Sequence, residues 1–277
     1  MELFTQTSLK CSKVITEAYS TSFTLGIKTL HRRFHMPIYG IYGFVRCADE
    51  IVDTFHDHDK RKLLQSFKEQ TYEAIESGIS LNPVLQAFQE VVKRYKIDRG
   101  YIDAFLKSME MDLDDHVYDA SLYKEYIFGS AEVVGLMCLK VFCEGDDAMF
   151  ERLKKPACSL GAAFQKVNFL RDMKSDYNDR GRVYFPHIEY SSFCNNSKEA
   201  IEADIKKDFD DAYAGIMALP RAARLGVYLA YVYYLKLFRK IQNLPATHIL
   251  NERVRVPDNT KLALLVGSYL RYRLNAI

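Results

Sequence analysis

The sequence predicts an all-α protein built as one domain. Glycine and proline are sparse, with 13 and 7 occurrences among 277 residues, which favours long helices over strand-and-turn architectures. Apolar residues recur with helical spacing in one segment after another along the chain. The sequence contains no alternating apolar run long enough for a central strand, and no repeat, low-complexity segment or linker that would divide residues 1–277.

The expected helices follow from this periodicity and from the residues that start and stop helices. The first helix should end near the hydroxyl cluster at 20–22, and Pro37 suits the first turn of a long helix that ends near Thr54. Loops are expected at 56–60 and 178–196, which are polar and lack periodicity. The expected helices cover residues 4–20, 30–34, 37–54, 59–77, 83–95, 98–116, 122–142, 149–178, 197–218, 221–242 and 258–274.

The composition argues against several classes of protein. The formal net charge is only +2, so bulk electrostatics give no support for a nucleic-acid partner. The six cysteines form no CxxC pair or regular framework, and we expect reduced thiols in a cytoplasmic protein. The first residues lack the basic and apolar regions of a signal peptide, and no apolar run reaches the ~18 residues of a membrane span. We therefore expect a soluble chain.

The most informative stretch is residues 161–186, which read GAAFQKVNFLRDMKSDYNDRGRVYFP. Four of its polar residues lie at offsets of 0, 3, 7 and 11, which return to one face of an α-helix: Gln165, Asn168, Asp172 and Asp176. One helix face should therefore carry two carboxylates and two amides.

An earlier stretch, YGFVRCADEIVD, repeats this geometry, with offsets of 0, 4, 7 and 11 for Tyr42, Arg46, Asp49 and Asp53. Mg²⁺ prefers few carboxylates, retained waters and the phosphate oxygens of a substrate, so two helices with such aspartate pairs make a frame for divalent cations. The guanidinium of Arg46 offers a planar donor fork for phosphate oxygens. A single aspartate pair is common on a solvated helix face, but two pairs with matching neighbours favour a metal and diphosphate site.

Three other polar groups are interpreted as structural. His31 and His35 have the spacing of a zinc pair, but no third ligand is near them in the sequence. The charged run at 56–60 is expected to be a hydrophilic loop. The acidic residues that end the helix over 98–116 resemble a further aspartate pair, but no Arg or amide keeps phase with them. We interpret them as a solvated helix end: Asp112, Asp115 and Asp119.

The two aspartate stretches resemble the paired aspartate-rich motifs of the phytoene and squalene synthase family, the head-to-head trans-prenyl synthases, and are most similar to those of bacterial phytoene synthases. The resemblance extends to YSTSF at 19–23, YIFGSAEVVG at 126–135 and RVYFP at 182–186, so it covers nearly the whole chain in order. It implies a single prenyl synthase domain over residues 1–277, folded as an isoprenoid synthase-type helical bundle with a central active-site cavity.

The resemblance also implies roles for individual residues. The expected metal ligands are Asp49, Asp53, Asn168, Asp172 and Asp176. The four aspartates would be catalytic together with Tyr126, which would assist carbocation chemistry. Contacts to the substrate diphosphate or the reacting carbons are expected from Tyr19, Ser20, Thr21, Ser22, Tyr42, Arg46, Gln165, Arg171, Tyr233 and Arg253. Mg²⁺ is the expected ion, with Mn²⁺ as a substitute.

Members of this family condense two allylic diphosphates head to head through a cyclopropylcarbinyl diphosphate. We expect geranylgeranyl diphosphate as the substrate and phytoene as the product, as in carotenoid biosynthesis. No NADPH is expected, because the chain has no GxGxxG signature. Two alternatives stay open. One is a dehydrosqualene or squalene-type synthase that uses farnesyl diphosphate, since tunnel depth sets chain length. The other is a catalytically inactive relative that acts as an interaction protein.

The expected partners are prenyl diphosphates, with no nucleic acid, and the resemblance allows peripheral contact with a membrane and with a downstream desaturase. Two positions depart from the family pattern. Ser175 stands where an acidic residue often precedes the last aspartate of the second motif, so Asp176 alone must hold that end. Glu132 stands where glycine is frequent in the tyrosine motif, which bears on the packing around Tyr126.

Overall fold

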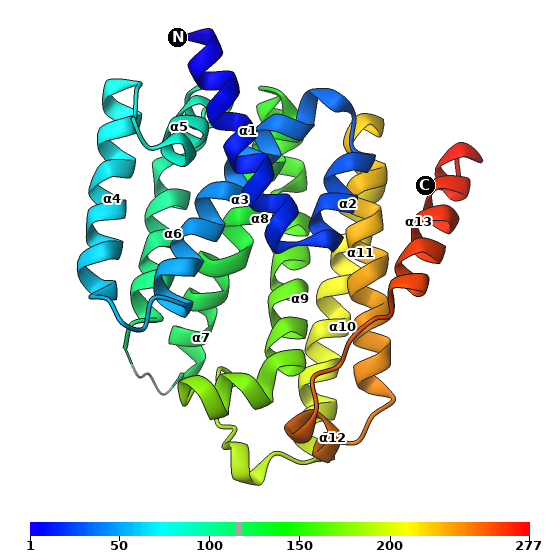
Figure 1. Cartoon of the computed structure of the whole chain (residues 1–277). Helices are drawn as coiled ribbons and strands as arrows, with labels where there is room; N and C mark the ends of the chain where they lie inside the picture. Colours follow the sequence, from blue (N-terminus) through cyan, green and yellow to red (C-terminus); the bar gives the residue numbers. More distant parts are fainter. Residues whose placement is uncertain (115–117) are drawn as a thin grey trace.

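A computed structural model describes residues 1–114 and 118–277, and every regular element in these ranges is a helix (Figure 1). The all-α prediction is confirmed. The elements are α1 (Glu2–Tyr19), α2 (Thr21–Thr29), α3 (Arg32–Asp53), α4 (Lys60–Ser77), α5 (Pro83–Tyr95), α6 (Arg99–Met111), α7 (Ala120–Ile127), a π-helical turn η1 (Phe128–Glu132), α8 (Val133–Cys143), α9 (Asp147–Arg180), a 3₁₀ turn η2 (Tyr190–Ser192), α10 (Asn195–Ala218), α11 (Arg221–Gln242), α12 (Ala246–Asn251) and α13 (Asp258–Arg273).

Many helix ends follow simple capping rules. The side chain of Asn82 accepts a hydrogen bond from the Val84 N–H at the start of α5, and similar caps start α2, α4, α6, α7 and α9. Helices α4 and α9 end where Gly78 and Gly181 adopt φ values of 72° and 67°. Glycine tolerates this left-handed conformation, so these two positions stop the helices sharply.

The N-terminal region differs from the prediction. The hydroxyl cluster does end the first helix, but Ser20 also caps α2 by accepting a hydrogen bond from Phe23, and no separate helix covers 30–34. Helix α3 begins at Arg32, so Pro37 lies inside it rather than in its first turn. The physical reason is that a hydroxyl side chain that follows one helix is also a favourable N-cap for the next.

The apolar helix predicted over 122–142 is divided by η1, a turn that contains small residues. A Cβ added to Gly129 would lie 2.4 Å from the Ala104 carbonyl oxygen of α6. A Cβ added to Gly161 on α9 would lie 2.8 Å from the Ala131 carbonyl oxygen of η1. These glycines therefore let α6 and α9 pack directly against the backbone of η1, as the recurrence of small residues suggested.

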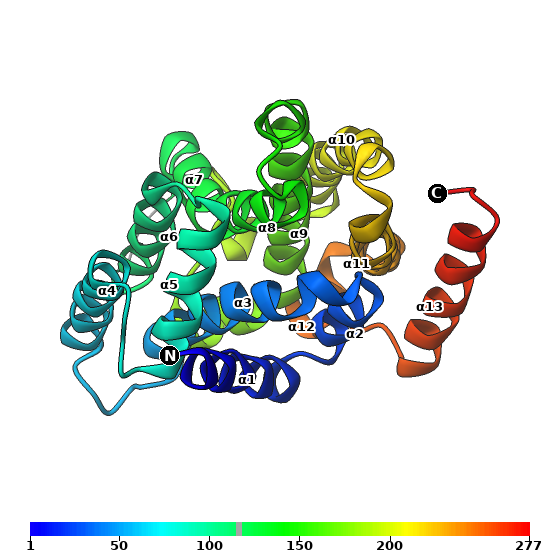
Figure 2. The same ribbon diagram turned by 90° about the horizontal axis from the view of Figure 1, so that it is seen from above.

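The stretch Ala120–Cys143 would be long and apolar enough to cross a membrane by length and composition alone. However, 56% of its apolar window is buried inside the fold, as expected for a core helix. On one side of it, α3, α5 and α6 form a cluster in which Phe44 stacks on Phe88 with ring centroids 3.8 Å apart. A second cluster joins α9, α10 and α11. Seen from above, α3, α8, α9 and α11 surround the centre, while α13 lies at the edge beside α11 (Figure 2).

Candidate functional site

A cavity of about 780 Å³ lies between α2, α3, α9, α11 and the stretch from α7 to α8. Its lining changes from apolar to polar along two helices: from Ile38 to Asp53 on α3, and from Leu153 to Asp176 on α9. Both helices run toward the same end of the molecule, so their polar ends meet (Figure 1). The two aspartate pairs predicted from the sequence thus line one cavity, whose size is typical of a small-molecule site.

The surroundings of Asp49 oppose the ionisation of its carboxyl group. Burial, together with the nearby charge of Asp53, raises the pKa of Asp49 to about 7, and Asp112 and Glu50 add to the effect. The guanidinium of Arg46 only partly opposes this rise. Because like charges and desolvation both disfavour the carboxylate, this end of the cavity favours a positively charged ligand.

Asp172, in the second pair, is already neutralised by two arginines. Arg171 donates through Nε to both carboxylate oxygens, at 3.0 and 3.1 Å, and Arg253 forms an ion pair in which its Nε lies 2.7 Å from Oδ1. Burial opposes the charge of Arg171, but the hydrogen bonds to Asp172 raise the pKa of the guanidinium above its ordinary value. The Ser175 hydroxyl donates a hydrogen bond to the Asp172 backbone carbonyl at 3.0 Å, within the helix. Asp176 is buried.

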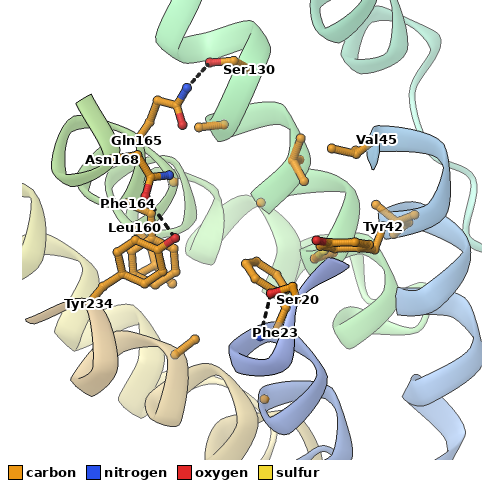
Figure 3. Close-up of a pocket in the computed structure, with 18 of the residues that line it drawn as sticks. Ser20, Phe23, Tyr42, Val45, Ser130, Leu160, Phe164, Gln165, Asn168 and Tyr234 are labelled. Carbon is orange, nitrogen blue, oxygen red and sulfur yellow. Dashed lines mark hydrogen bonds between the residues drawn. The ribbon is translucent and has the colours of Figure 1, made fainter. Parts of the chain in front are cut away.

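The two amides of this stripe are oriented by neighbouring helices. The Tyr234 hydroxyl donates to Asn168 Oδ1 at 3.3 Å, and Gln165 Nε2 donates to the Ser130 hydroxyl at 3.2 Å. Figure 3 shows both amides on one side of the cavity, facing Phe23 and Tyr42 across it. Helices α9, α11 and η1 therefore hold these polar groups in fixed orientations.

Arg46 lies on α3, on the same helix face as Tyr42 and Asp49. Its guanidinium carbon lies 4.3 Å from the centre of the Tyr19 ring, and Nη2 donates to Glu50, one turn on. Its Nε is buried and has no hydrogen-bond partner among the residues that the structure describes. An arginine held by a ring and one carboxylate, with a donor left over at the polar end of a cavity, suits an anionic ligand.

A buried polar cluster surrounds Tyr126. The Tyr126 hydroxyl donates to both oxygens of Asp112, at 3.1 and 2.9 Å, and Arg182 Nη1 lies 3.1 Å from Asp112 Oδ1. The ring of Tyr184 stacks on that of Tyr126 with centroids 5.0 Å apart. Burial and the charge of Asp112 raise the pKa of Tyr126 well above its ordinary value, so this phenol stays protonated.

A family model described as squalene/phytoene synthase matches residues 16–260. The chain belongs to this family. It is 27% identical to a phytoene synthase from Arthrospira platensis, over 96% of this chain and 94% of that protein. A 4,4'-diapophytoene synthase from Staphylococcus haemolyticus is 24% identical, over 72% of this chain and 68% of that protein. The resemblance stated from the motifs is therefore confirmed.

Solved structures agree with this family assignment at the level of the fold. A dehydrosqualene synthase in complex with a ligand superposes with a TM-score of 0.81, covering 99% of this chain and 98% of that one at 21% identity. The predicted isoprenoid synthase-type bundle is confirmed. Members of the family are prenyltransferase-type synthases, so the chain is assigned to that class of enzyme.

Not every residue named from the family motifs lines the cavity. Thr21, Ser22 and Tyr233 lie outside its lining, and Ser22 and Tyr233 border a smaller pocket instead. On α11 the tyrosine that lines the cavity is Tyr234. The other predicted site residues all line the cavity: Tyr19, Ser20, Tyr42, Arg46, Asp49, Asp53, Tyr126, Gln165, Asn168, Arg171, Asp172, Asp176 and Arg253.

The interpretation of the third acidic group was wrong for Asp112, which is only 7% exposed and lines the cavity. Asp119 caps α7, and Asp115 lies outside the described residues. Arg182 and Tyr184 also line the cavity, although sequence reasoning gave them no role; their signal was the family motif RVYFP. The two histidines were predicted to be solvated helix residues: His31 is exposed and caps α3, whereas His35 is partly buried and hydrogen-bonds the Leu30 carbonyl at 2.9 Å.

The family implies a divalent metal, and the cavity can be tested for it by its donor set. Within the described ranges, no three His, Cys, Asp or Glu side chains are grouped closely enough to hold an ion by themselves. Mg²⁺ does not need such a group, because it keeps waters and binds substrate phosphates. The carboxyl groups of Asp49 and Asp53 and the amide of Asn168 line the cavity and are oxygen donors of the kind that this ion prefers. A bound cation would also favour the ionised form of Asp49, which its surroundings oppose. The residues fit the ion.

Proposed function

We propose that the protein condenses two molecules of geranylgeranyl diphosphate head to head, with Mg²⁺ or Mn²⁺, and forms phytoene. The observation that carries the proposal is the polarity of the cavity: two aspartate pairs and four arginines at one end, and an apolar lining along the rest. The polar end suits the diphosphates, and the apolar remainder suits the prenyl chains. The family assignment supports the reaction class.

Asp49, Asp53, Asn168, Asp172 and Asp176 would hold the metal ions. The ions would neutralise the diphosphate as the carbon–oxygen bond breaks. The arginines bind the non-bridging oxygens of the same group. Arg171 and Arg253 now bond Asp172, so a diphosphate at this end competes with Asp172 for their N–H groups. The protein thus supplies preorganised positive charge where negative charge develops.

The apolar part of the cavity protects the carbocations from water. Aromatic faces line it, including the stacked pair of Phe164 and Tyr234, whose centroids lie 3.9 Å apart. An aromatic face attracts a cation by ~0.5–2 kcal/mol. Tyr126 is held as a neutral phenol by burial and by Asp112, so it offers a ring face and an oxygen near the polar end. Because phytoene forms by loss of protons and diphosphate, no reductant is required.

The experiment that tests the proposal incubates the purified protein with Mg²⁺ and with geranylgeranyl or farnesyl diphosphate in separate reactions. The hydrocarbons are then identified by mass spectrometry. Phytoene from the first reaction supports the proposal. Dehydrosqualene from the second reaction alone supports the farnesyl alternative, which the similarity to a 4,4'-diapophytoene synthase favours. Hydrocarbon from neither reaction overturns both and leaves the inactive relative as the explanation.

A further inference from the structure

Helix α13 presents apolar side chains to solvent. Leu262, Val266 and Leu270 are 61%, 52% and 55% exposed, and they recur every four residues, which keeps them on one face. Tyr269 and Leu274 are exposed beside them. Figures 1 and 2 both place α13 at the edge of the molecule, beyond α11. An apolar face on an outermost helix marks an interaction surface.

The C-terminal half of α13 is held to α11 by polar contacts. Arg271 Nη1 donates to the Tyr228 hydroxyl at 3.3 Å, and the Tyr272 hydroxyl donates to the Arg221 carbonyl at 3.3 Å. The Arg221 guanidinium also lies 5.0 Å from the centre of the Tyr272 ring. These contacts fix the helix, so its outer face is presented in a defined orientation.

The N-terminal half of α13 covers a small pocket that is almost wholly apolar. Leu264 of α13, Leu25 of α2 and Leu229 of α11 are among the residues that line it. Three more of its lining residues, Phe23, Ala230 and Tyr234, also line the central cavity. The two spaces therefore share a wall.

This shared wall contains one small side chain and two rings. Figure 3 shows the rings of Phe23 and Tyr234 projecting from α2 and α11. Phe23 is 40% exposed and its nearest ring partner is Tyr42, at a centroid distance of 5.4 Å. Phe23 therefore forms part of the partition between the cavity and the pocket under α13.

We propose that the outer face of α13 binds an anionic lipid bilayer, and that the pocket beneath α13 is the route by which the apolar product passes from the cavity to that bilayer. The charge of this segment favours lipid: residues 258–277 contain Lys261, Arg271 and Arg273 and one acidic residue, Asp258, at the start of the helix. Arg273 continues the exposed stripe, where a long basic side chain reaches headgroups while its neighbours enter the apolar phase. The route rests on the proposed function, because a hydrocarbon product needs an apolar receiver.

The first experiment measures binding of the full chain to phosphatidylcholine vesicles with and without phosphatidylglycerol by co-sedimentation, in the absence of substrate. We expect binding to the anionic vesicles that weakens with salt. The triple variant Leu262→Ser, Val266→Ser, Leu270→Ser should bind at least about tenfold more weakly, because three apolar anchors are lost. Leu81→Ser is the matched control, since Leu81 is 90% exposed away from α13 and should bind like the wild type. Wild-type protein that ignores both vesicles, or a triple variant that binds normally, overturns the proposal.

The second experiment tests the route with Leu264→Trp, which fills the pocket, and Leu264→Ala, which enlarges it. Leu264 lines only the small pocket, so the rate of a single turnover should stay within about twofold of the wild type in both variants. Steady-state turnover on anionic vesicles should fall at least about fivefold in Leu264→Trp alone, if product release limits it. Equal single-turnover and steady-state losses would make the pocket part of the substrate site and overturn the route.

The two experiments separate this inference from the proposed function. Vesicle binding needs no turnover, so it is measured whether or not the protein makes phytoene. An active synthase that does not bind vesicles overturns only the present inference. A protein that binds vesicles through α13 but makes no hydrocarbon overturns only the proposed function and the route that rests on it.

Discussion

Replacement of Asp49 by asparagine should stabilise the metal-free protein above neutral pH while it abolishes turnover. The pKa of Asp49 is raised to about 7 from 3.8 by burial and by Asp53, so the folded state resists ionisation that the unfolded state allows. Below pH ~4 both states hold the proton and the group has no effect. Between pH ~4 and ~7 the unfolded state loses its proton first, and stability falls.

The size of the effect follows from the shift. About 3 pKa units at 1.36 kcal/mol each give a destabilisation of at most ~4 kcal/mol above pH ~7, which Asp49→Asn removes. For a chain of this size, ~2 °C per kcal/mol corresponds to a gain of up to ~8 °C in Tm. Thermal unfolding followed by circular dichroism at pH 5 and pH 8 measures it, and the gain should be larger at pH 8.

Added Mg²⁺ should raise the Tm of the wild type more than that of Asp49→Asn, because the ion would relieve the same repulsion. Asp210→Asn is the control, since Asp210 pairs with Lys206 on the surface of α10 and does not line the cavity. A gain that is equal at pH 5 and pH 8, or no gain at all, would refute the reasoning.

Three further predictions concern the site and its support. Asp172→Asn should lower turnover at least about 100-fold with an unchanged helical circular dichroism spectrum; a wild-type rate would contradict the metal assignment. Asp112→Asn should lower the free energy of unfolding by ~3–5 kcal/mol in denaturant titrations, because it removes the carboxylate that pairs with the largely buried guanidinium of Arg182. The double variant with Arg182→Met should recover part of that loss, and a double variant as unstable as the single one would count against the pair. Gly129→Ala should lower Tm by several degrees, because its Cβ would lie 2.4 Å from a carbonyl oxygen of α6; an unchanged Tm would mean that the helices part easily.

The fold and the two acidic stripes could be predicted from the sequence because they depend on local spacing. Offsets of 7 and 11 from Gln165 and from Tyr42 place each pair of aspartates on one helix face whatever packs against it. The choice between Tyr233 and Tyr234 could not be made, because α11 has no polar stripe to fix which face meets the cavity. An error of one residue turns a helical position by ~100°.

The role of Asp112 could not be predicted, because it depends on a contact between distant parts of the chain. Arg182 is 70 residues away, and the loop that carries it returns to the end of α6 only in the folded protein. The start of α2 was missed for a different reason. Residues 20–22 are hydroxyl-rich, and such residues favour a turn and a helix cap equally well.

The π-helical turn η1 keeps the cavity-lining side chains of α7 and α8 on the same side. One row of cavity-lining residues on this wall recurs every fourth position, at Tyr126, Ser130, Val134, Cys138 and Phe142, and Ala131, Gly135 and Leu139 form a second row beside it. In a uniform α-helix each step of four advances ~40° beyond a full turn, so such a row would wind around the helix. The wider turn at 128–132 takes up about one residue of that drift, ~100°. If the same residues followed α-helical geometry throughout, Phe142 would therefore lie ~160° around the helix axis from Tyr126, and the phenol and the apolar floor would no longer face the same ligand.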